Sequence, residues 1–91
     1  MTARYLEPLH YAILRLFTDG HKRSAKDVVN ELWDTYGGYK LLTIQDTEEV
    51  LETAKENNLL DEEGYKANQG QLIIYYRISE FGSKMVKKYL N

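Results

Sequence analysis

Apolar residues recur at helical spacing in three segments of the first 57 residues. The first segment spans residues 6–18 and carries Pro8 in its first turn, where a missing backbone N–H costs least. The second segment runs from residue 24 to residue 36, and the third runs from residue 43 to about residue 57. This half of the chain is therefore predicted to form helices joined by short connections.

Polar residues and glycines mark where these helices begin and end. Ser24 and Thr43 each offer a hydroxyl that can accept a hydrogen bond from the first helical turn, and an aspartate follows three residues later in both cases. Gly20 lies at the end of the first helix. Gly37 and Gly38 are expected to end the second helix with left-handed or open backbone.

The third helix has a narrow apolar stripe and a row of acids. At 100° per residue, the positions expected to face inward are Ile44, Thr47, Leu51 and Ala54. The outward line then carries Gln45, Glu49, Glu52 and Glu56. Most of this outward line is negatively charged, so the exposed face of the helix faces water or a partner.

The periodicity changes to alternation after Asn58, which can take the left-handed position at a helix end. Leu59 and Leu60 begin a short predicted strand, and a second strand over residues 72–78 follows a polar turn at residues 67–70. Leu72, Ile74, Tyr76 and Ile78 are predicted to share one face of that strand. The two strands are predicted to form a hairpin.

Ser79 is the predicted cap of a final helix with apolar residues at Phe81, Met85, Val86, Tyr89 and Leu90. The predicted order is therefore three helices, two strands and one helix, in an α+β domain that covers residues 1–91. Residues 21–23 are a candidate third strand beside the hairpin. A chain of 91 residues is too short to build two hydrophobic cores, so a single domain is expected.

Composition limits the classes of function. The net charge is -2, so the chain lacks the strongly basic character of a typical nucleic-acid-binding domain, and any such role depends on local patches. No apolar run approaches the ~20 residues that a membrane span needs, and the first residues do not resemble a signal peptide. We therefore expect a cytoplasmic protein that does not contact membranes.

Candidate chemistry is sparse. The chain has no cysteine, and His10 and His21 belong to different predicted elements. No metal-binding motif or glycine-rich phosphate loop is present in the sequence. We predict no enzymatic activity, no catalytic residue, no metal and no cofactor.

Two stretches of the sequence are similar to a known family. Residues 50–64, VLETAKENNLLDEEG, resemble the segment where the recognition helix of PadR-like and MarR-like winged-helix regulators leads into the first wing strand. Residues 75–90, YYRISEFGSKMVKKYL, resemble their second wing strand and the helix that follows. The resemblance implies a winged helix-turn-helix fold and a dimeric transcriptional regulator of double-stranded DNA, with the third helix in the major groove and the wing on the backbone or minor groove.

The acidic third helix limits how such a protein could read DNA, because carboxylates are repelled by phosphates. We therefore expect DNA contacts from the start of the second helix, the region before and at the start of the third helix, and the wing. The candidate residues are Lys22, Arg23, Lys26, Lys40, Thr43, Gln45, Lys66, Asn68 and Gln69.

A second hypothesis belongs to a different functional class. In it, the winged helix is a protein-interaction module that does not bind DNA, and the acidic stripe of Glu49, Glu52 and Glu56, together with exposed tyrosines, binds a basic protein surface. Binding to generic duplex DNA across a salt series separates the two hypotheses.

Tyrosine is abundant, with eight in 91 residues, and tyrosines favour interfaces. Regulators of this family dimerise through their terminal helices, which implies a homodimer here. The interface candidates are Tyr5, Tyr11, Met85, Tyr89 and Leu90. For each of these residues, core packing is the alternative.

Overall fold

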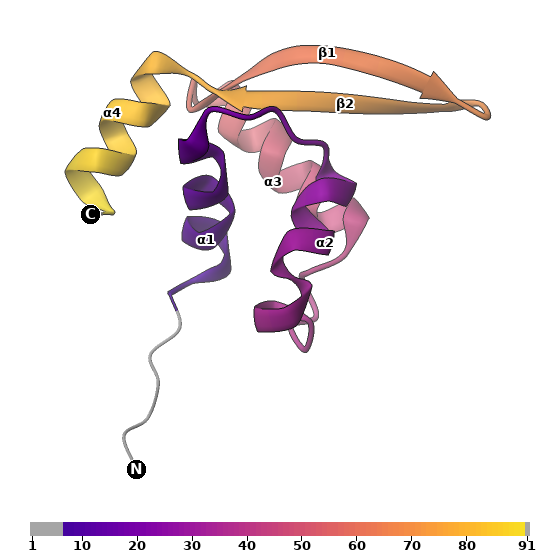
Figure 1. Ribbon diagram of the computed structural model, residues 1–91, viewed down its shortest axis with the longest axis horizontal. Helices are drawn as coiled ribbons and strands as arrows, with labels where there is room; N and C mark the ends of the chain where they lie inside the picture. Colours follow the sequence, from indigo (N-terminus) through magenta and orange to yellow (C-terminus); the bar gives the residue numbers. More distant parts are fainter. Residues whose placement is uncertain (1–6, 91) are drawn as a thin grey trace.

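The computed structural model describes residues 7–90. Its elements are α1 (Leu9–Leu16), the short 3-10 helix η1 (Phe17–Asp19), α2 (Ala25–Tyr36), α3 (Ile44–Glu56), β1 (Leu60–Asn68), β2 (Gln71–Ile78) and α4 (Glu80–Tyr89). Three helices thus precede an antiparallel wing-like hairpin and a C-terminal helix (Figure 1). The predicted α+β class and element order are confirmed.

Local hydrogen bonds at the helix starts explain why these boundaries were predictable. The backbone N–H of Asp27 donates to Ser24 Oγ at 3.3 Å, and the N–H of Ser24 donates back to the Asp27 carboxylate at 2.9 Å, which completes a capping box. Thr43 Oγ1 accepts from the N–H of Asp46 at 3.1 Å. Ser79 Oγ accepts from the N–H of residue 82 at 2.8 Å.

The first helical segment ends near Gly20 as predicted, whereas the end of the second helix differs from the prediction. Pro8 precedes α1 as its cap, and the helix ends at Leu16, where η1 continues to Gly20 with a φ of 84°. Gly37 is right-handed, with a φ of −59°, and Gly38 does not have a positive φ either. The N–H of Gly37 donates to the carbonyl of Trp33 at 2.8 Å, so an ordinary helical hydrogen bond ends α2 without left-handed backbone.

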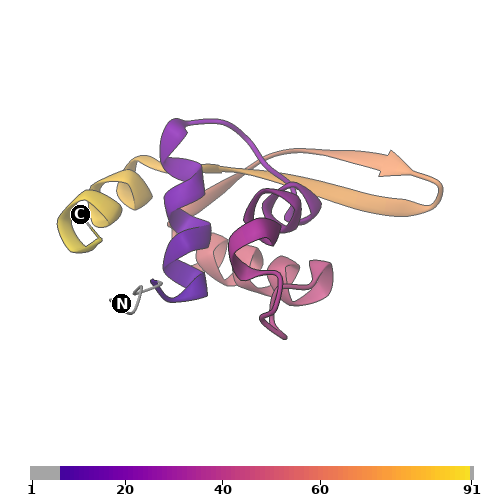
Figure 2. The same cartoon turned by 60° about the horizontal axis from the view of Figure 1, so that its bottom comes forward.

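The first strand is longer than the predicted short strand, because β1 continues to Asn68 and includes residues 67 and 68 of the predicted turn. The turn consists of Gln69 and Gly70, whose φ values of 51° and 79° are both positive, as a type I′ turn requires. Asn58 has a φ of 65°, which confirms its predicted left-handed conformation after α3. The turn end of the hairpin extends beyond the helices (Figures 1 and 2).

A β-bulge at Glu63 determines which side chains of β1 share a face. Glu62 pairs with Tyr76, whereas Gly64 pairs with Tyr75, so Glu63 is an extra residue in β1. Beyond the bulge, Lys66 pairs with Ile73. Without that extra residue, every side chain of β1 beyond this point would turn to the opposite face.

The predicted third strand at residues 21–23 is reduced to a single bridge. The N–H of Arg23 donates to the carbonyl of Tyr76 at 2.9 Å, and the N–H of Tyr76 donates to the carbonyl of Arg23 at 2.9 Å. The chain enters α2 directly afterwards, so this segment cannot pair further along β2.

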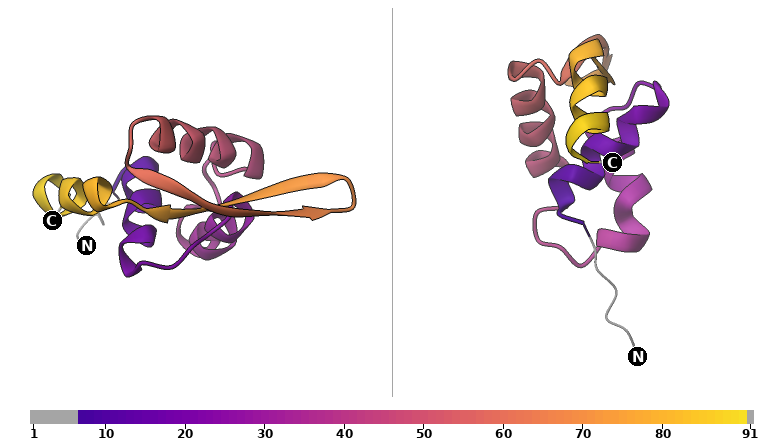
Figure 3. Two further views of the ribbon diagram at one scale, coloured as in Figure 1. Left: turned by 90° about the horizontal axis from the view of Figure 1, so that it is seen from above. Right: turned by 90° about the vertical axis from the view of Figure 1, so that its left-hand side faces the viewer.

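The core lies between the helices and the inner face of the hairpin. The largest fully buried side chains are Phe17, Ile13, Leu51, Leu60, Val28 and Thr47. Seen from above, α3 runs along one side of the hairpin, and α1 and α2 lie on the other (Figure 3). Within residues 7–90, none of the helices has the length and apolar character that crossing a membrane requires.

The orientation of α3 is confirmed except at its first turn. Thr47, Leu51 and Ala54 are buried as predicted, but the side chain of Ile44 is 47% exposed. Leu42, just before the helix, is buried in the core cluster. Ile44 begins the helix at the edge of that core and therefore remains at the surface.

Candidate functional site

A groove of about 840 Å³ separates the start of α2 and the outward side of α3 from the hairpin. The lining residues of α2 and its cap are Ser24, Ala25 and Lys26, and those of α3 are Ile44, Glu48, Glu49, Glu52 and Thr53. The hairpin contributes Asn68, Gln71, Leu72, Ile73, Ile74 and Tyr76. We call this cavity the α3–hairpin groove.

The groove combines apolar and acidic side chains. Ile44 and Leu72 are both exposed, although they are large and apolar. Glu48 and Glu49 are exposed and make no ion pair within residues 7–90. The acidic outward face that the sequence predicted therefore lies beside the hairpin and faces an open space.

Glu52 differs from these two glutamates because it is half-buried and bonded within the molecule. The hydroxyl of Tyr76 donates to Glu52 Oε2 at 3.2 Å, and Lys55 Nζ lies 3.7 Å from the other carboxylate oxygen. Burial, followed by the nearby Glu52 carboxylate, raises the pKa of Tyr76 to about 12. Glu52 thus connects α3 to the hairpin, whereas the sequence had placed it on the outward line.

The other face of the hairpin carries cations. Tyr76 is buried against the helices, so alternation directs Tyr75 to the opposite face, and the pairing places Lys66 and Asn68 there as well. Lys22 Nζ lies 5.2 Å from the centre of the Tyr75 ring, within the range of a cation–π interaction. We call Lys22, Lys66, Asn68 and Tyr75 the outer hairpin face.

Arg23 is held inside the molecule and does not contribute to this face. Its side chain donates to both oxygens of Asp19 at 2.8 and 2.9 Å, to both oxygens of Glu31 at 2.8 and 3.0 Å, and to the carbonyl of Leu16 at 2.8 Å. Arg23 is only 8% exposed. These hydrogen bonds raise the pKa of Arg23 and hold the pKa of Asp19 well below its usual value.

The remaining DNA-binding candidates do not lie together on one surface. Lys26 lines the α3–hairpin groove, and Gln69 forms the hairpin turn. Lys40 lies in the connection between α2 and α3, which is on the opposite side of the helices from the hairpin (Figure 1). Thr43 caps α3, and Gln45 is exposed on its first turn. Lys22, Lys66 and Asn68 are thus the predicted residues that share the outer hairpin face, and Asn68, next to the turn, also borders the α3–hairpin groove.

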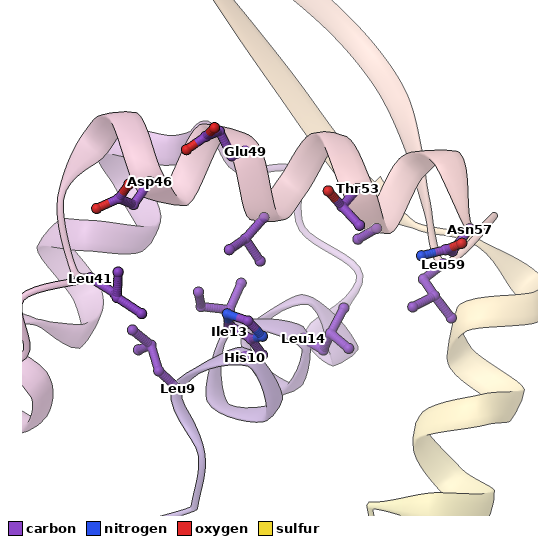
Figure 4. Close-up of a pocket in the computed structure, with 12 residues that line it drawn as sticks. Leu9, His10, Ile13, Leu14, Leu41, Asp46, Glu49, Thr53, Asn57 and Leu59 are labelled. Carbon is purple, nitrogen blue, oxygen red and sulfur yellow. The ribbon is translucent and has the colours of Figure 1, made fainter.

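A second cavity, of about 420 Å³, lies between α1 and α3 (Figure 4). Leu9, His10, Ile13 and Leu14 of α1 form one wall of the cavity. Asp46 and Glu49 stand on the opposite wall. The sequence did not identify this cavity, because its walls come from segments that lie far apart along the chain.

The candidate dimer residues lie on the terminal helices. Tyr11 and Tyr89 are exposed, whereas Met85 and Leu90 are half-buried. Tyr5 lies outside the described residues. The carbonyl of Leu90 accepts a hydrogen bond from Arg15 Nη2 at 2.6 Å, which fastens the end of α4 to α1.

Sequence reasoning missed two exposed apolar residues of the hairpin, Tyr65 and Leu72. The sequence analysis assigned no role to Tyr65 and placed Leu72 only on one face of its strand, and the core does not reach either residue. The short alternation of apolar and polar residues over positions 65–68 was the available signal for Tyr65, but the acids at residues 61–63 before it do not alternate.

Comparison of the sequence with protein-family models and with curated proteins finds no match of either kind.

Proposed function

We propose that the protein is a DNA-binding, winged-helix regulator-like protein that contacts duplex DNA through the outer hairpin face. The observation that carries the proposal is the gathering of Lys22, Lys66, Asn68 and Tyr75 on one face of the hairpin. Residues 64–75 contain no aspartate or glutamate, so the projecting part of the hairpin can approach phosphates without repulsion.

The position of the acids on α3 argues against placing this helix in the major groove. A recognition helix in the major groove would bring Glu48 and Glu49 close to phosphates and base edges, where donors are needed. The hairpin has the opposite character, because its ammonium and amide groups suit contacts with the backbone or the minor groove. Binding is therefore expected to depend strongly on salt and weakly on sequence.

The proposal includes a homodimer formed through the terminal helices. Phe81 and Tyr89 of α4 are 49% and 64% exposed, and Tyr11 of α1 is exposed as well. Large exposed aromatic side chains on neighbouring elements are typical of interfaces. Because α4 and the hairpin turn extend in opposite directions, dimerisation at α4 leaves the outer hairpin face open (Figure 1).

The test is the binding of a mixed-sequence duplex, measured by fluorescence anisotropy across a salt series. Two neutralised phosphates per chain predict a slope of about −1.8 for log K against log salt. The double variant Lys22→Glu and Lys66→Glu should abolish binding, because it reverses both charges of the outer hairpin face. Lys87→Glu on α4 reverses one charge away from that face and should leave binding nearly intact.

Two results would contradict the proposal. One is wild-type affinity that does not change with salt. The other is unchanged binding in the Lys22 and Lys66 double variant when circular dichroism shows that it is folded.

A further inference from the structure

One edge of β2 has main-chain groups without a strand partner. Tyr76 exchanges both of its backbone hydrogen bonds with Arg23, on the side of β2 that faces away from β1. In an antiparallel ladder these directions alternate, so the N–H and C=O groups of Ile74 and Leu72 point to the same free edge. The sheet of the described residues contains only β1 and β2, so no strand within residues 7–90 pairs with that part of the edge.

This free edge lies along the α3–hairpin groove. Consecutive residues from Gln71 to Ile74 line the groove, although their side chains alternate between the two faces of the hairpin. Because neighbouring residues of β2 all line the groove, the groove follows the edge of the strand as well as its inner face. An extended chain placed in the groove would therefore meet unpaired donors and acceptors.

The charge of the groove favours a cationic occupant. Three carboxylates, those of Glu48, Glu49 and Glu52, line it together with one ammonium, that of Lys26. Glu48 and Glu49 have no ion-pair partner in the part of the chain that the structure describes. The exposed side chains of Ile44 and Leu72 add an apolar surface next to these acids.

We propose that the α3–hairpin groove binds an extended, lysine- or arginine-rich segment of a protein partner, which adds a strand to the free edge of β2. The residues of that segment opposite Leu72 and Ile74 turn their side chains to the helix side of the sheet, where the carboxylates of α3 stand. A helix fits this site less well, because its own main-chain groups are already paired. Duplex DNA is disfavoured by the carboxylates.

The inference goes beyond the proposed function, because it concerns the opposite face of the hairpin and does not require DNA. Asn68 is the one residue that the outer hairpin face and the α3–hairpin groove have in common. The partner segment takes the place along β2 that residues 21–23 leave when the chain turns into α2.

The probe is a dye-labelled eight-residue peptide in which lysine alternates with threonine, with both termini blocked. Its binding to the full chain is measured by fluorescence anisotropy without DNA. One control peptide has glutamate in place of lysine, which reverses the charge. A second control has the same sequence with the backbone nitrogen of every residue methylated, which keeps the charge and removes the N–H donors needed for strand pairing. Both controls are expected to bind at least about tenfold more weakly.

Protein variants separate strand pairing from charge attraction. Leu72→Pro removes an N–H that points to the free edge, while the hairpin hydrogen bonds of the neighbouring residues remain. This variant should bind the lysine peptide about tenfold more weakly, and Leu72→Thr, which keeps the N–H, should bind it within about threefold of the wild type. The double variant Glu48→Gln and Glu49→Gln should weaken binding by about tenfold or more.

Amide hydrogen exchange gives a residue-level readout. The N–H groups of Ile74 and Leu72 should exchange quickly in the free protein and become protected when the lysine peptide is bound. The variant Lys22→Glu with Lys66→Glu should bind the peptide as tightly as the wild type or more tightly. Failure of DNA binding can thus be distinguished from failure of this inference.

Three results would overturn the proposed addition of a strand to β2. The first is equal binding of the lysine peptide and either control peptide. The second is unchanged affinity in both Leu72→Pro and the Glu48 and Glu49 double variant. The third is protection of Ile74 and Leu72 in the absence of peptide together with self-association that Leu72→Pro abolishes, because the edge would then be occupied by a second copy of this chain.

Discussion

Arg23 is the residue that links most of the N-terminal half together. Its guanidinium joins Asp19 after α1 and Glu31 on α2, and its backbone pairs with Tyr76 of β2. A buried guanidinium is stable only when its donors are satisfied, and here carboxylates on both sides and a carbonyl oxygen provide the acceptors. The basic character that made Arg23 a candidate for DNA binding serves the fold.

At the scale of this residue, we expect Asp19→Asn to destabilise the fold mainly above pH ~4. Because the pKa of Asp19 is lowered in the folded state, its ionised carboxylate stabilises the fold above the unfolded pKa. That stabilisation is lost as pH falls below ~4 toward the lowered folded pKa. The carboxylate is 42% exposed, so solvent screening limits the effect at neutral pH to about 1 kcal/mol.

The measurement is urea unfolding followed by tryptophan fluorescence, at neutral pH and near pH ~2. Asp34→Asn is the control, because Asp34 is exposed on α2 and makes no ion pair within residues 7–90. A stability difference between wild type and Asp19→Asn that stays constant over this pH range would refute the role given to the Asp19 carboxylate.

At the scale of elements, α4 is fixed where it begins. Ser79 caps the helix, and its hydroxyl also donates to the carbonyls of Asn58 at 2.6 Å and Leu59 at 3.1 Å. Gly82, in the first turn of the helix, is buried against the same backbone, and a Cβ there would overlap the carbonyl oxygen of Leu59. The close approach of α4 to the residues that follow α3 therefore depends on the absence of a side chain at Gly82.

We expect Gly82→Ala to lower the free energy of unfolding by roughly 1–3 kcal/mol, because the overlap with backbone cannot be relieved by a side-chain movement. This outweighs the ~1 kcal/mol that alanine contributes to helix stability relative to glycine. Thermal unfolding followed by circular dichroism measures the change. Gly38→Ala is the control and should be neutral or slightly stabilising, because Gly38 has open space around it and no positive φ. A Gly82→Ala variant at least as stable as the wild type would contradict the packing described for α4.

At the scale of the whole molecule, the shape is elongated, with principal extents of 49 × 29 × 19 Å. The hairpin turn projects at one end and α4 at the other, with the helical core between them (Figure 1). Each projection exposes large apolar side chains, Tyr65 and Leu72 on the hairpin and Phe81 and Tyr89 on α4. The two ends can therefore serve different contacts.

We expect Phe81→Ser with Tyr89→Ser to weaken self-association by about tenfold or more, because both exposed rings belong to the proposed dimer interface. Sedimentation equilibrium measures the monomer–dimer constant. Lys87→Ser, at an exposed charged position of the same helix, is the control and should have little effect. Wild-type protein that remains monomeric, or a control that dissociates equally, would show that α4 does not form the interface.

The sequence by itself determined the helix starts and the α+β element order. Ser24, Thr43 and Ser79 act on N–H groups within three residues, so neighbouring sequence was sufficient to identify them. The left-handed Asn58 was predictable for the same local reason. The acids of α3 were also correctly placed on an outward face, apart from the half-buried Glu52, because helical periodicity is a short-range property.

Only the tertiary structure decided how the candidate site is composed. The extra residue Glu63 in β1 turns Lys66 and Asn68 to the outer hairpin face, and this register depends on pairing with a strand that comes later in the chain. The burial of Arg23 and the exposure of Ile44 likewise depend on which distant elements reach them. Caps and periodicity are set by nearby residues, whereas register and burial are set by contacts between segments that the linear sequence keeps apart.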